Sequence, residues 1–188
     1  IGKSLAYLVP AIEWAVTNNT PVVISTNTKN LQSQLFEKDI PLLQQVLGKP
    51  FKAALIRGRS NYLCLRKLLH AVDESGLSLA FEERGSLIQV LGWLQHSQSG
   101  DMNELVEWDQ MRRAGLGGAL TSTSEECAGR ACRHYRSCFL RRARAKSLAA
   151  DIVVANHALV FAELGPRSPA LPPYQHIVFD EAHNLEEA

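Results

Sequence analysis

Apolar residues recur along this chain with two different spacings. Near its start, Leu5, Leu8, Val9, Ile12 and Val16 follow the spacing of a helix. Short apolar and β-branched runs, which are typical of buried strands, lie at residues 21–25, 53–56, 151–155 and 176–180. Further helices are expected at residues 29–38 and from Pro41 onward. Strands that alternate with helices predict an α/β fold with a parallel, doubly wound sheet.

The middle of the chain follows neither spacing regularly. Between residues 61 and 150 the pattern is helical and irregular, with no convincing strand. We therefore expect this segment to be an insertion that divides the sheet domain into residues 1–60 and 151–188.

The first residues, Gly2-Lys3-Ser4, suit the end of a phosphate-binding loop. In such a loop the lysine reaches the terminal phosphates and the hydroxyl ligates magnesium. The helix predicted to begin at Ser4 supports this hypothesis, because anions bind at helix N-termini. An ordinary helix start is the alternative.

A second candidate site lies near the other end, where the apolar run 177–179 leads into Asp180 and Glu181. Acids at the carboxyl end of a buried parallel strand face a crevice. Asp180 would hold hydrated magnesium, and Glu181 would orient and deprotonate the attacking water. The alternative is a solvated cluster of acids at a helix start, since Glu186 and Glu187 follow.

Charge is unevenly distributed in this 188-residue chain, although its net charge is only +1. Residues 73–126 contain ten acids and three arginines, a balance of 3 − 10 = −7. Residues 127–150 contain no acid and seven basic residues. This change predicts one face that meets a polyanion, with a basic helix that is merely soluble as the alternative.

Targeting signals are absent from the printed sequence. No run is long and apolar enough to span a membrane, and the first residues do not resemble a signal peptide. We therefore expect a cytoplasmic protein. The half-motif at residue 1 and the missing initiator methionine predict a piece of a longer enzyme.

The four cysteines all lie in the predicted insertion. Four and five residues separate Cys127, Cys132 and Cys138, and 62 residues separate Cys64 from Cys127. In a reducing compartment such clustered thiols favour metal binding over disulfides. They could hold an iron-sulfur cluster or zinc. Structural zinc sites usually have two close pairs of ligands, so three clustered cysteines with one distant partner slightly favour the iron-sulfur cluster. Ordinary buried cysteines are the alternative, and His134 could replace one ligand.

Several motifs together resemble one family, the XPD-like iron-sulfur DNA helicases of superfamily two, and most closely their DinG type. The matching stretches occur in the family's order and cover the chain: residues 2–5, 23–28, 31–35, 58–64, the cysteine trio, 153–159 and 180–183. The last of these, Asp-Glu-Ala-His, corresponds to the family's DEAH motif.

This resemblance implies a RecA-like P-loop ATPase that binds ATP and Mg²⁺, with catalytic Lys3, Asp180 and Glu181. Gly2 and Ser4 would also contact the nucleotide, and His183 would link its site to movement. Cys64, Cys127, Cys132 and Cys138 would hold a 4Fe-4S cluster, and residues 73–111 would form an arch-like segment.

The resemblance also implies DNA as the partner. Thr26 and Thr28 would lie near the DNA backbone, in an enzyme that moves 5′ to 3′ on single-stranded DNA and opens forked or structured duplexes during DNA repair. The arginine-rich run independently favours phosphate binding, through Arg130, Arg133 and Arg136. We expect a monomer.

The chain departs from the family by lacking the first half of the phosphate loop and the second motor domain. That domain supplies arginines that complete the ATP site, so the printed chain alone should not unwind DNA. Two other classes stay open: a zinc-bearing, nucleic-acid-dependent ATPase that remodels without unwinding, and a non-catalytic DNA-binding module.

Overall fold

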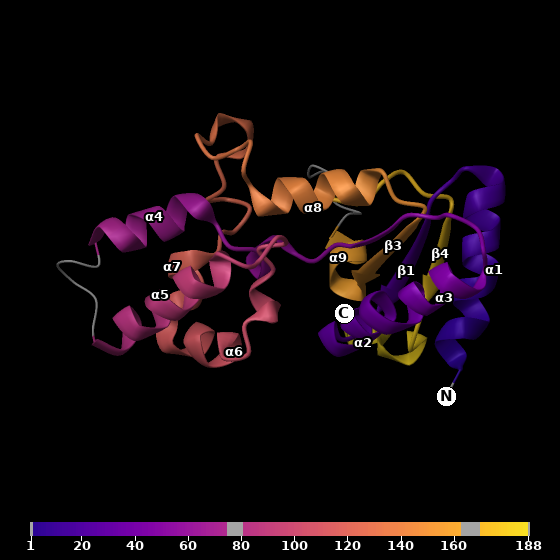
Figure 1. Ribbon diagram of the computed structural model, residues 1–188, viewed down its shortest axis with the longest axis horizontal. Helices are drawn as coiled ribbons and strands as arrows, with labels where there is room; N and C mark the ends of the chain where they lie inside the picture. Colours follow the sequence, from indigo (N-terminus) through magenta and orange to yellow (C-terminus); the bar gives the residue numbers. More distant parts are fainter. Residues whose placement is uncertain (1, 75–80, 163–169, 188) are drawn as a thin grey trace. The chain divides into compact units, whose positions relative to one another are not determined.

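A computed structural model describes residues 2–74, 81–162 and 170–187, which form two compact units (Figure 1). Unit 1 comprises residues 1–57 and 143–188, and unit 2 comprises residues 58–142. Of the predicted arch-like segment, residues 75–80 lie outside the described part of the chain.

Unit 1 is built on a four-stranded sheet with the order β2-β3-β1-β4. Its strands are β1 (Val22–Thr26), β2 (Ala53–Leu55), β3 (Ile152–Asn156) and β4 (His176–Phe179). Every pair is parallel, and Ile24 lies opposite both Val154 and Val178. The α/β class and the parallel sheet are thereby confirmed.

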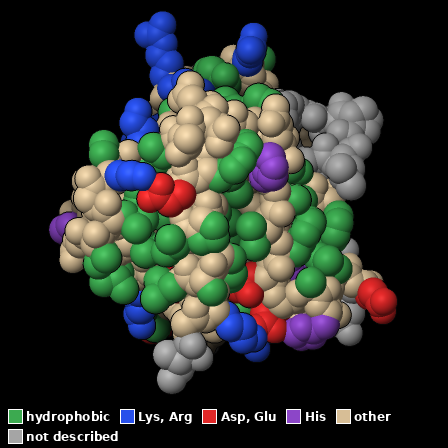
Figure 2. Space-filling view, turned by 90° about the vertical axis from the view of Figure 1, so that its right-hand side faces the viewer, with side chains coloured by type: hydrophobic (Ala, Val, Ile, Leu, Met, Phe, Trp, Pro, Cys, Tyr) green, Lys and Arg blue, Asp and Glu red, His purple; other side chains and the backbone are tan. Residues whose placement is uncertain are grey.

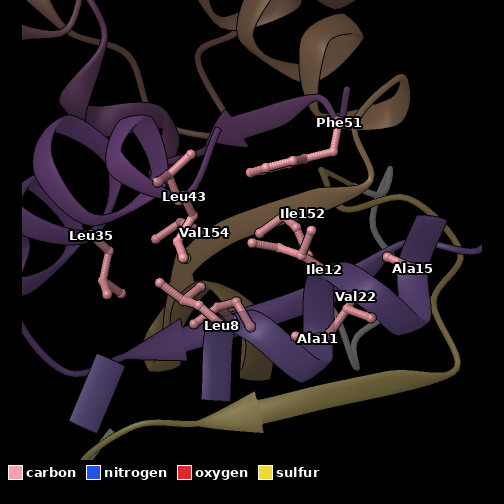
Figure 3. Packing of buried hydrophobic residues seen from close by; sticks show 12 residues of the cluster. Leu8, Ala11, Ile12, Ala15, Val22, Leu35, Leu43, Phe51, Ile152 and Val154 are labelled. Carbon is pink, nitrogen blue, oxygen red and sulfur yellow. The ribbon is translucent and has the colours of Figure 1, made fainter. Parts of the chain in front are cut away.

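One face of this sheet is covered by helices from the first fifty residues. These are α1 (Lys3–Asn18), α2 (Lys29–Gln34), the π-helical turn η1 (Leu35–Asp39) and α3 (Ile40–Val46). Leu8 and Ile12 of α1 pack with Leu43 of α3 and Val154 of β3 in one core cluster (Figure 3), which also includes Ile24 of β1. Because both faces of the inner strands are covered, β1 and β3 consist almost entirely of buried residues.

The helix α9 (His157–Ala162) contacts β1 and β3. Side chains alternate along a strand, so Ser25 points away from the face on which Ile24 packs. Ser25 instead meets His157, the first residue of α9. The unit ends with the short 3₁₀ segment η6 (Ala182–Glu187).

Unit 2 contains mainly helices. In chain order these are η2 (Arg59–Asn61), α4 (Leu65–Glu74), α5 (Phe81–Leu94), η3 (Met102–Glu104), α6 (Trp108–Met111), η4 (Arg112–Leu116), α7 (Gly117–Leu120), η5 (Gly129–Ala131) and the first part of α8 (Phe139–Leu148). Within the described residues of unit 2 the only β pairing is the isolated bridge between Tyr62 and Asp101.

A close contact in unit 2 requires glycine at position 100. Gly100 has a φ of +65°, and a Cβ at this position would lie 2.1 Å from Cγ of Phe139. The carbonyl oxygen of Gly100 also accepts a hydrogen bond of 2.9 Å from the Leu63 backbone N–H. Gly100 therefore joins the segment before Cys64 to the segment after Cys138.

Among the described residues, no helix combines the length and apolar character that crossing a membrane requires.

Candidate functional site

The candidate site lies in unit 1, where α1 begins and β4 ends. Gly2 precedes α1 with a φ of 95°, a left-handed conformation that glycine adopts without strain. Lys3 is strongly exposed, and Ser4 follows it in the first turn of the helix. The backbone N–H groups of this turn have no partner within the helix and can bind an anion.

The second half of the site is the turn after β4. The Asp180 backbone N–H donates a hydrogen bond of 2.8 Å to the Ser25 carbonyl oxygen, so the turn begins at the edge of the sheet. Glu181 then adopts a φ of 53°, which is uncommon for a residue other than glycine. Such conformations persist only where surrounding contacts hold them.

The two halves meet through a pair of side-chain contacts. Lys3 Nζ lies 3.0 Å from Glu181 Oε1, and the Tyr7 hydroxyl donates a hydrogen bond of 3.0 Å to Asp180 Oδ2. Near the lower edge of Figure 2, acidic, basic and histidine side chains gather on one face of the molecule. The structure thus brings together Lys3, Asp180 and Glu181, the three residues expected to be catalytic.

These contacts shift the protonation equilibria of three groups. The hydrogen bond and charge of Lys3 hold the pKa of Glu181 below its ordinary value, and Glu181 in turn raises the pKa of Lys3. Burial, followed by the negative charge of Asp180, raises the pKa of Tyr7. At neutral pH, Tyr7 is therefore a protonated donor, and the Lys3–Glu181 pair is charged.

His183 lies beside the same turn. Its Nδ1 is 3.4 Å from Glu181 Oε2, its Nε2 is 3.1 Å from the Asn184 side-chain amide, and its side chain is largely exposed. The predicted link between nucleotide site and movement thus lies within reach of the carboxylate that would act on water.

A buried polar pair behind the turn could not be identified from the sequence. Ser25 Oγ lies 2.7 Å from His157 Nδ1, and both residues are almost completely buried. Burial lowers the pKa of His157, although the backbone and charge of Asp180 act in the opposite direction. The neutral imidazole also contacts the Phe179 ring, at 5.8 Å between centroids. Ser25 lies in β1, His157 follows β3 and Phe179 ends β4, so these contacts connect the ends of three adjacent strands.

Curated proteins resemble this chain along its whole length, although no protein-family model matches it. The ATP-dependent DNA helicase YoaA of Haemophilus influenzae is 37% identical over 190 residues, which cover 99% of this chain and 29% of that protein. The ATP-dependent helicase DinG of Mycobacterium tuberculosis is 37% identical over 207 residues, covering 99% of this chain and 30% of that protein. Over its whole length, the chain is similar to a segment of DinG-type helicases.

The resemblance covers this whole chain but only part of each relative. The chain spans about 30% of the length of these two relatives. The 3′-5′ exonuclease DinG of Bacillus subtilis is 32% identical over 198 residues, covering all of this chain and 20% of that protein. The name of this third relative differs from the helicase names of the other two.

The loop after β1 contains the threonines expected near DNA. Thr26 is fully buried, and its hydroxyl donates a hydrogen bond of 3.3 Å to the Thr28 carbonyl oxygen. The Thr28 hydroxyl accepts a hydrogen bond of 3.3 Å from the Leu31 N–H and caps α2. Thr26 thus shapes the loop from within, whereas Thr28 lies at its exposed surface.

All four cysteines lie in unit 2, half-buried, and none forms a disulfide. The Cys64 N–H donates to the Leu120 carbonyl oxygen, and Arg66 donates to the Glu126 carbonyl oxygen, both at 2.8 Å. The start of α4 therefore lies against the segment that leads into Cys127.

Within the described residues, no three His, Cys, Asp or Glu side chains lie together as they would around a single metal ion. A tetrahedral zinc site needs its thiolates within about 2.3 Å of one centre. An iron-sulfur cluster lies between its thiolates and separates them further. The number of thiols and their place in one unit fit such a cluster.

The basic run around the trio divides into two groups. Arg130, Arg133 and Arg136, the residues expected to bind DNA, are exposed. In contrast, Arg141 donates hydrogen bonds to the Tyr135 and Arg136 carbonyl oxygens, and Arg142 donates to that of Gln98. The first group can meet phosphates, while the second stabilises the cysteine segment.

Proposed function

We propose that this DinG-type chain is the ATP-binding part of a DNA helicase. In this role Lys3 binds the terminal phosphates, Ser4 and Asp180 bind Mg²⁺ directly or through its water, and Glu181 orients the attacking water. One observation carries the proposal: Lys3 lies 3.0 Å from Glu181 although 178 positions separate them. The similarity to YoaA and DinG, which are named as ATP-dependent helicases, supports it.

The proposed reaction requires Lys3 to exchange partners. When the lysine binds phosphate it must leave Glu181, whose carboxylate is then available to the water. Such an exchange is easy for an exposed ion pair, because its net contribution to stability is small. Glu181 thus competes with phosphate for Lys3, and His183 lies close enough to sense the exchange.

The experiment is Glu181→Gln in the full-length protein that contains this chain. Loss of the base should lower DNA-stimulated ATP hydrolysis by about 10²–10⁴-fold. Binding of Mg-ATP should stay equal or become tighter by up to about fivefold, because Lys3 loses its competitor. Steady-state hydrolysis and the binding of a fluorescent ATP analogue separate the two effects.

The matched control is Glu13→Gln. Glu13 also pairs with a lysine in unit 1, with its Oε2 2.5 Å from Lys49 Nζ. Both activities should stay within about twofold of the wild type. Wild-type hydrolysis in the Glu181 variant would refute the proposed site.

We further propose that the enzyme moves 5′ to 3′ on single-stranded DNA and opens forked duplexes. The exposed group Arg130, Arg133 and Arg136 and the loop of Thr28 support contact with a phosphate backbone. Unwinding of duplexes with either a 5′ or a 3′ single-stranded tail tests the direction. The 5′-tailed substrate should be opened, and preference for the 3′ tail would reverse the proposed polarity.

A 4Fe-4S cluster held by Cys64, Cys127, Cys132 and Cys138 is part of the proposal. Four half-buried thiols without disulfides in one unit support it. The arrangement of three clustered cysteines with one distant partner in the sequence favours it slightly over the zinc of a remodelling ATPase. Unit 2 would then be the inserted cluster domain, and unit 1 would be the first motor domain.

We also propose that residues 1–188 alone hydrolyse ATP poorly, because arginines from a second motor domain can contribute about 10³–10⁵ in rate. The parent enzyme would act as a cytoplasmic monomer in DNA repair.

A further inference from the structure

Tyr7 connects the first helix directly to the acid expected to hold magnesium. Its hydroxyl donates a hydrogen bond of 3.0 Å to Asp180 Oδ2. Its half-buried ring packs against the core cluster that includes Leu8 and Ile12. The core thus fixes the ring, and the ring fixes the position of the hydroxyl.

The spacing of α1 explains why two residues of one helix reach two adjacent acids. Residues four apart lie on the same helical face, one turn from each other. Lys3 contacts Glu181, and Tyr7, one turn later, contacts Asp180. A single face of α1 therefore supports both carboxylates of the turn.

The contact occupies one of the two oxygens of Asp180. With Oδ2 accepting the hydrogen bond from Tyr7, Oδ1 would be the oxygen that faces the magnesium shell. A hydrogen bond to a metal-binding carboxylate orients it, and loss of such a bond commonly costs about 10–100-fold in metal affinity or activity. The hydroxyl is neutral, so it orients Asp180 without cancelling its charge.

We propose that Tyr7 is a positioning residue that orients Asp180 and thereby sets the magnesium affinity of the nucleotide site. This inference rests on the proposed function, because it assigns Asp180 to Mg²⁺. Tyr7 does not touch the reacting atoms and acts through the carboxylate. A purely structural Tyr7 would contribute only the packing of its ring.

Tyr7→Phe in the full-length protein separates the two roles, since it removes the hydroxyl and keeps the ring. ATP hydrolysis should be measured at saturating ATP over a range of Mg²⁺ concentrations. We expect the Mg²⁺ concentration for half-maximal rate to rise about tenfold or more. Excess Mg²⁺ should restore the rate to within about twofold of the wild type.

Two further variants protect the test. Tyr174→Phe removes a tyrosine hydroxyl elsewhere in unit 1, and it should leave the Mg²⁺ dependence unchanged. Tyr7→Leu also lacks the hydroxyl and should show the same Mg²⁺ shift. If Tyr7→Phe melts well below the wild type, the Mg²⁺ dependence of Tyr7→Leu is measured at a temperature where that variant is folded. This measurement then decides whether Tyr7 positions Asp180 or only packs.

Asp180→Asn distinguishes failure of this inference from failure of the proposed function. If Asp180→Asn hydrolyses ATP normally, the magnesium site itself is wrong. If Asp180→Asn is inactive but Tyr7→Phe has the wild-type Mg²⁺ dependence, only the role of Tyr7 is refuted. A rate that stays low in Tyr7→Phe at every Mg²⁺ concentration would also refute it.

Discussion

The two units of this chain are stabilised in different ways. In unit 1 the central strands β1 and β3 pair through backbone hydrogen bonds, and Ile24 and Val154 are completely buried. In the described part of unit 2, the only β pairing is one isolated bridge, between Tyr62 and Asp101. Long basic side chains instead supply partners for backbone carbonyl groups, as Arg66, Lys67 and Arg142 do.

This difference indicates which interactions each unit depends on. A parallel sheet satisfies its own backbone groups, so its stability follows from apolar burial. A segment of short helices and turns must satisfy those groups with side chains, and each such bond contributes modestly. The proposed cluster would add four covalent anchors where regular structure is sparse.

The largest effect is expected in unit 2, when one of the four cysteine ligands of the proposed cluster is removed. Cys132→Ser should reduce the iron content from about four atoms per chain to nearly none and should expose unit 2 to proteolysis. Nucleotide binding by unit 1 should change less than about twofold, because its sheet does not depend on the cluster. Iron analysis and limited proteolysis measure the first effect.

Ser137→Ala is the control for this prediction, since it alters an exposed neighbour of Cys138. It should retain the iron. One zinc per chain in place of iron would favour the remodelling ATPase. If Cys132→Ser disrupted both units equally, unit 1 would depend on the cluster as much as unit 2 does, which would contradict the comparison.

The next effect concerns the core of unit 1. Ile24→Ala should lower the free energy of unfolding of unit 1 by about 2–5 kcal/mol, because it leaves a cavity between β3, β4 and α1. Hydrogen exchange of β1 and β3 amides reports the change. Ile88→Ala makes the same change at an exposed site of unit 2 and should alter stability by less than about 0.5 kcal/mol. Equal effects at both positions would contradict the assigned core.

A somewhat smaller effect is expected at Gly100. Gly100→Ala forces a Cβ against the Phe139 ring at a positive φ, so it should destabilise unit 2 by about 2–4 kcal/mol. Gly118→Ala adds a methyl group in a helix where no atom lies within 4 Å, and it should be neutral or slightly stabilising. Thermal unfolding followed by exchange in α7 and α8 compares the two.

The smallest effect is a pH dependence at the start of α4. The Thr123 backbone N–H, followed by Lys67, holds the pKa of Glu126 below its ordinary value of 4.5. The stabilisation is therefore present above about pH 4.5 and is lost as pH falls through the lower pKa of the folded state. At pH 6, Glu126→Gln should loosen the start of α4 relative to the wild type.

The difference between Glu126→Gln and the wild type should shrink as the pH falls through the lowered pKa of Glu126, because its carboxylate then becomes protonated. Exchange at the amides of residues 65–68 measures it. A difference that persists at low pH would show that the carboxylate charge is not responsible.

Much of the sheet could be predicted from the sequence, because β-branched runs mark its strands. The run at residues 21–25 became β1 at Val22–Thr26, and that at 176–180 became β4 at His176–Phe179. The predicted separate helices at 29–38 and from Pro41 are instead a continuous run of α2, η1 and α3. The π-helical turn η1 accommodates Pro41, whose missing N–H interrupts regular bonding.

The supporting contacts of the site could not be predicted in the same way. Tyr7 resembles one more apolar position of α1, and its contact with Asp180 depends on where β4 lies in the sheet. Ser25 and His157 belong to strand and helix patterns that contain no sign of their pairing. These contacts follow from the strand order, which a local pattern does not contain.

The strand order has a consequence for how the protein is made. The central strand β1 pairs only with β3 and β4, which both follow unit 2 in the chain. From Thr26 to Ile152 is 152 − 26 = 126 residues, so at about 5–20 residues per second β1 waits roughly 6–25 seconds for a partner during synthesis. During that interval its apolar Val-Val-Ile segment has two unpaired edges, which are sites for aggregation or for chaperone binding.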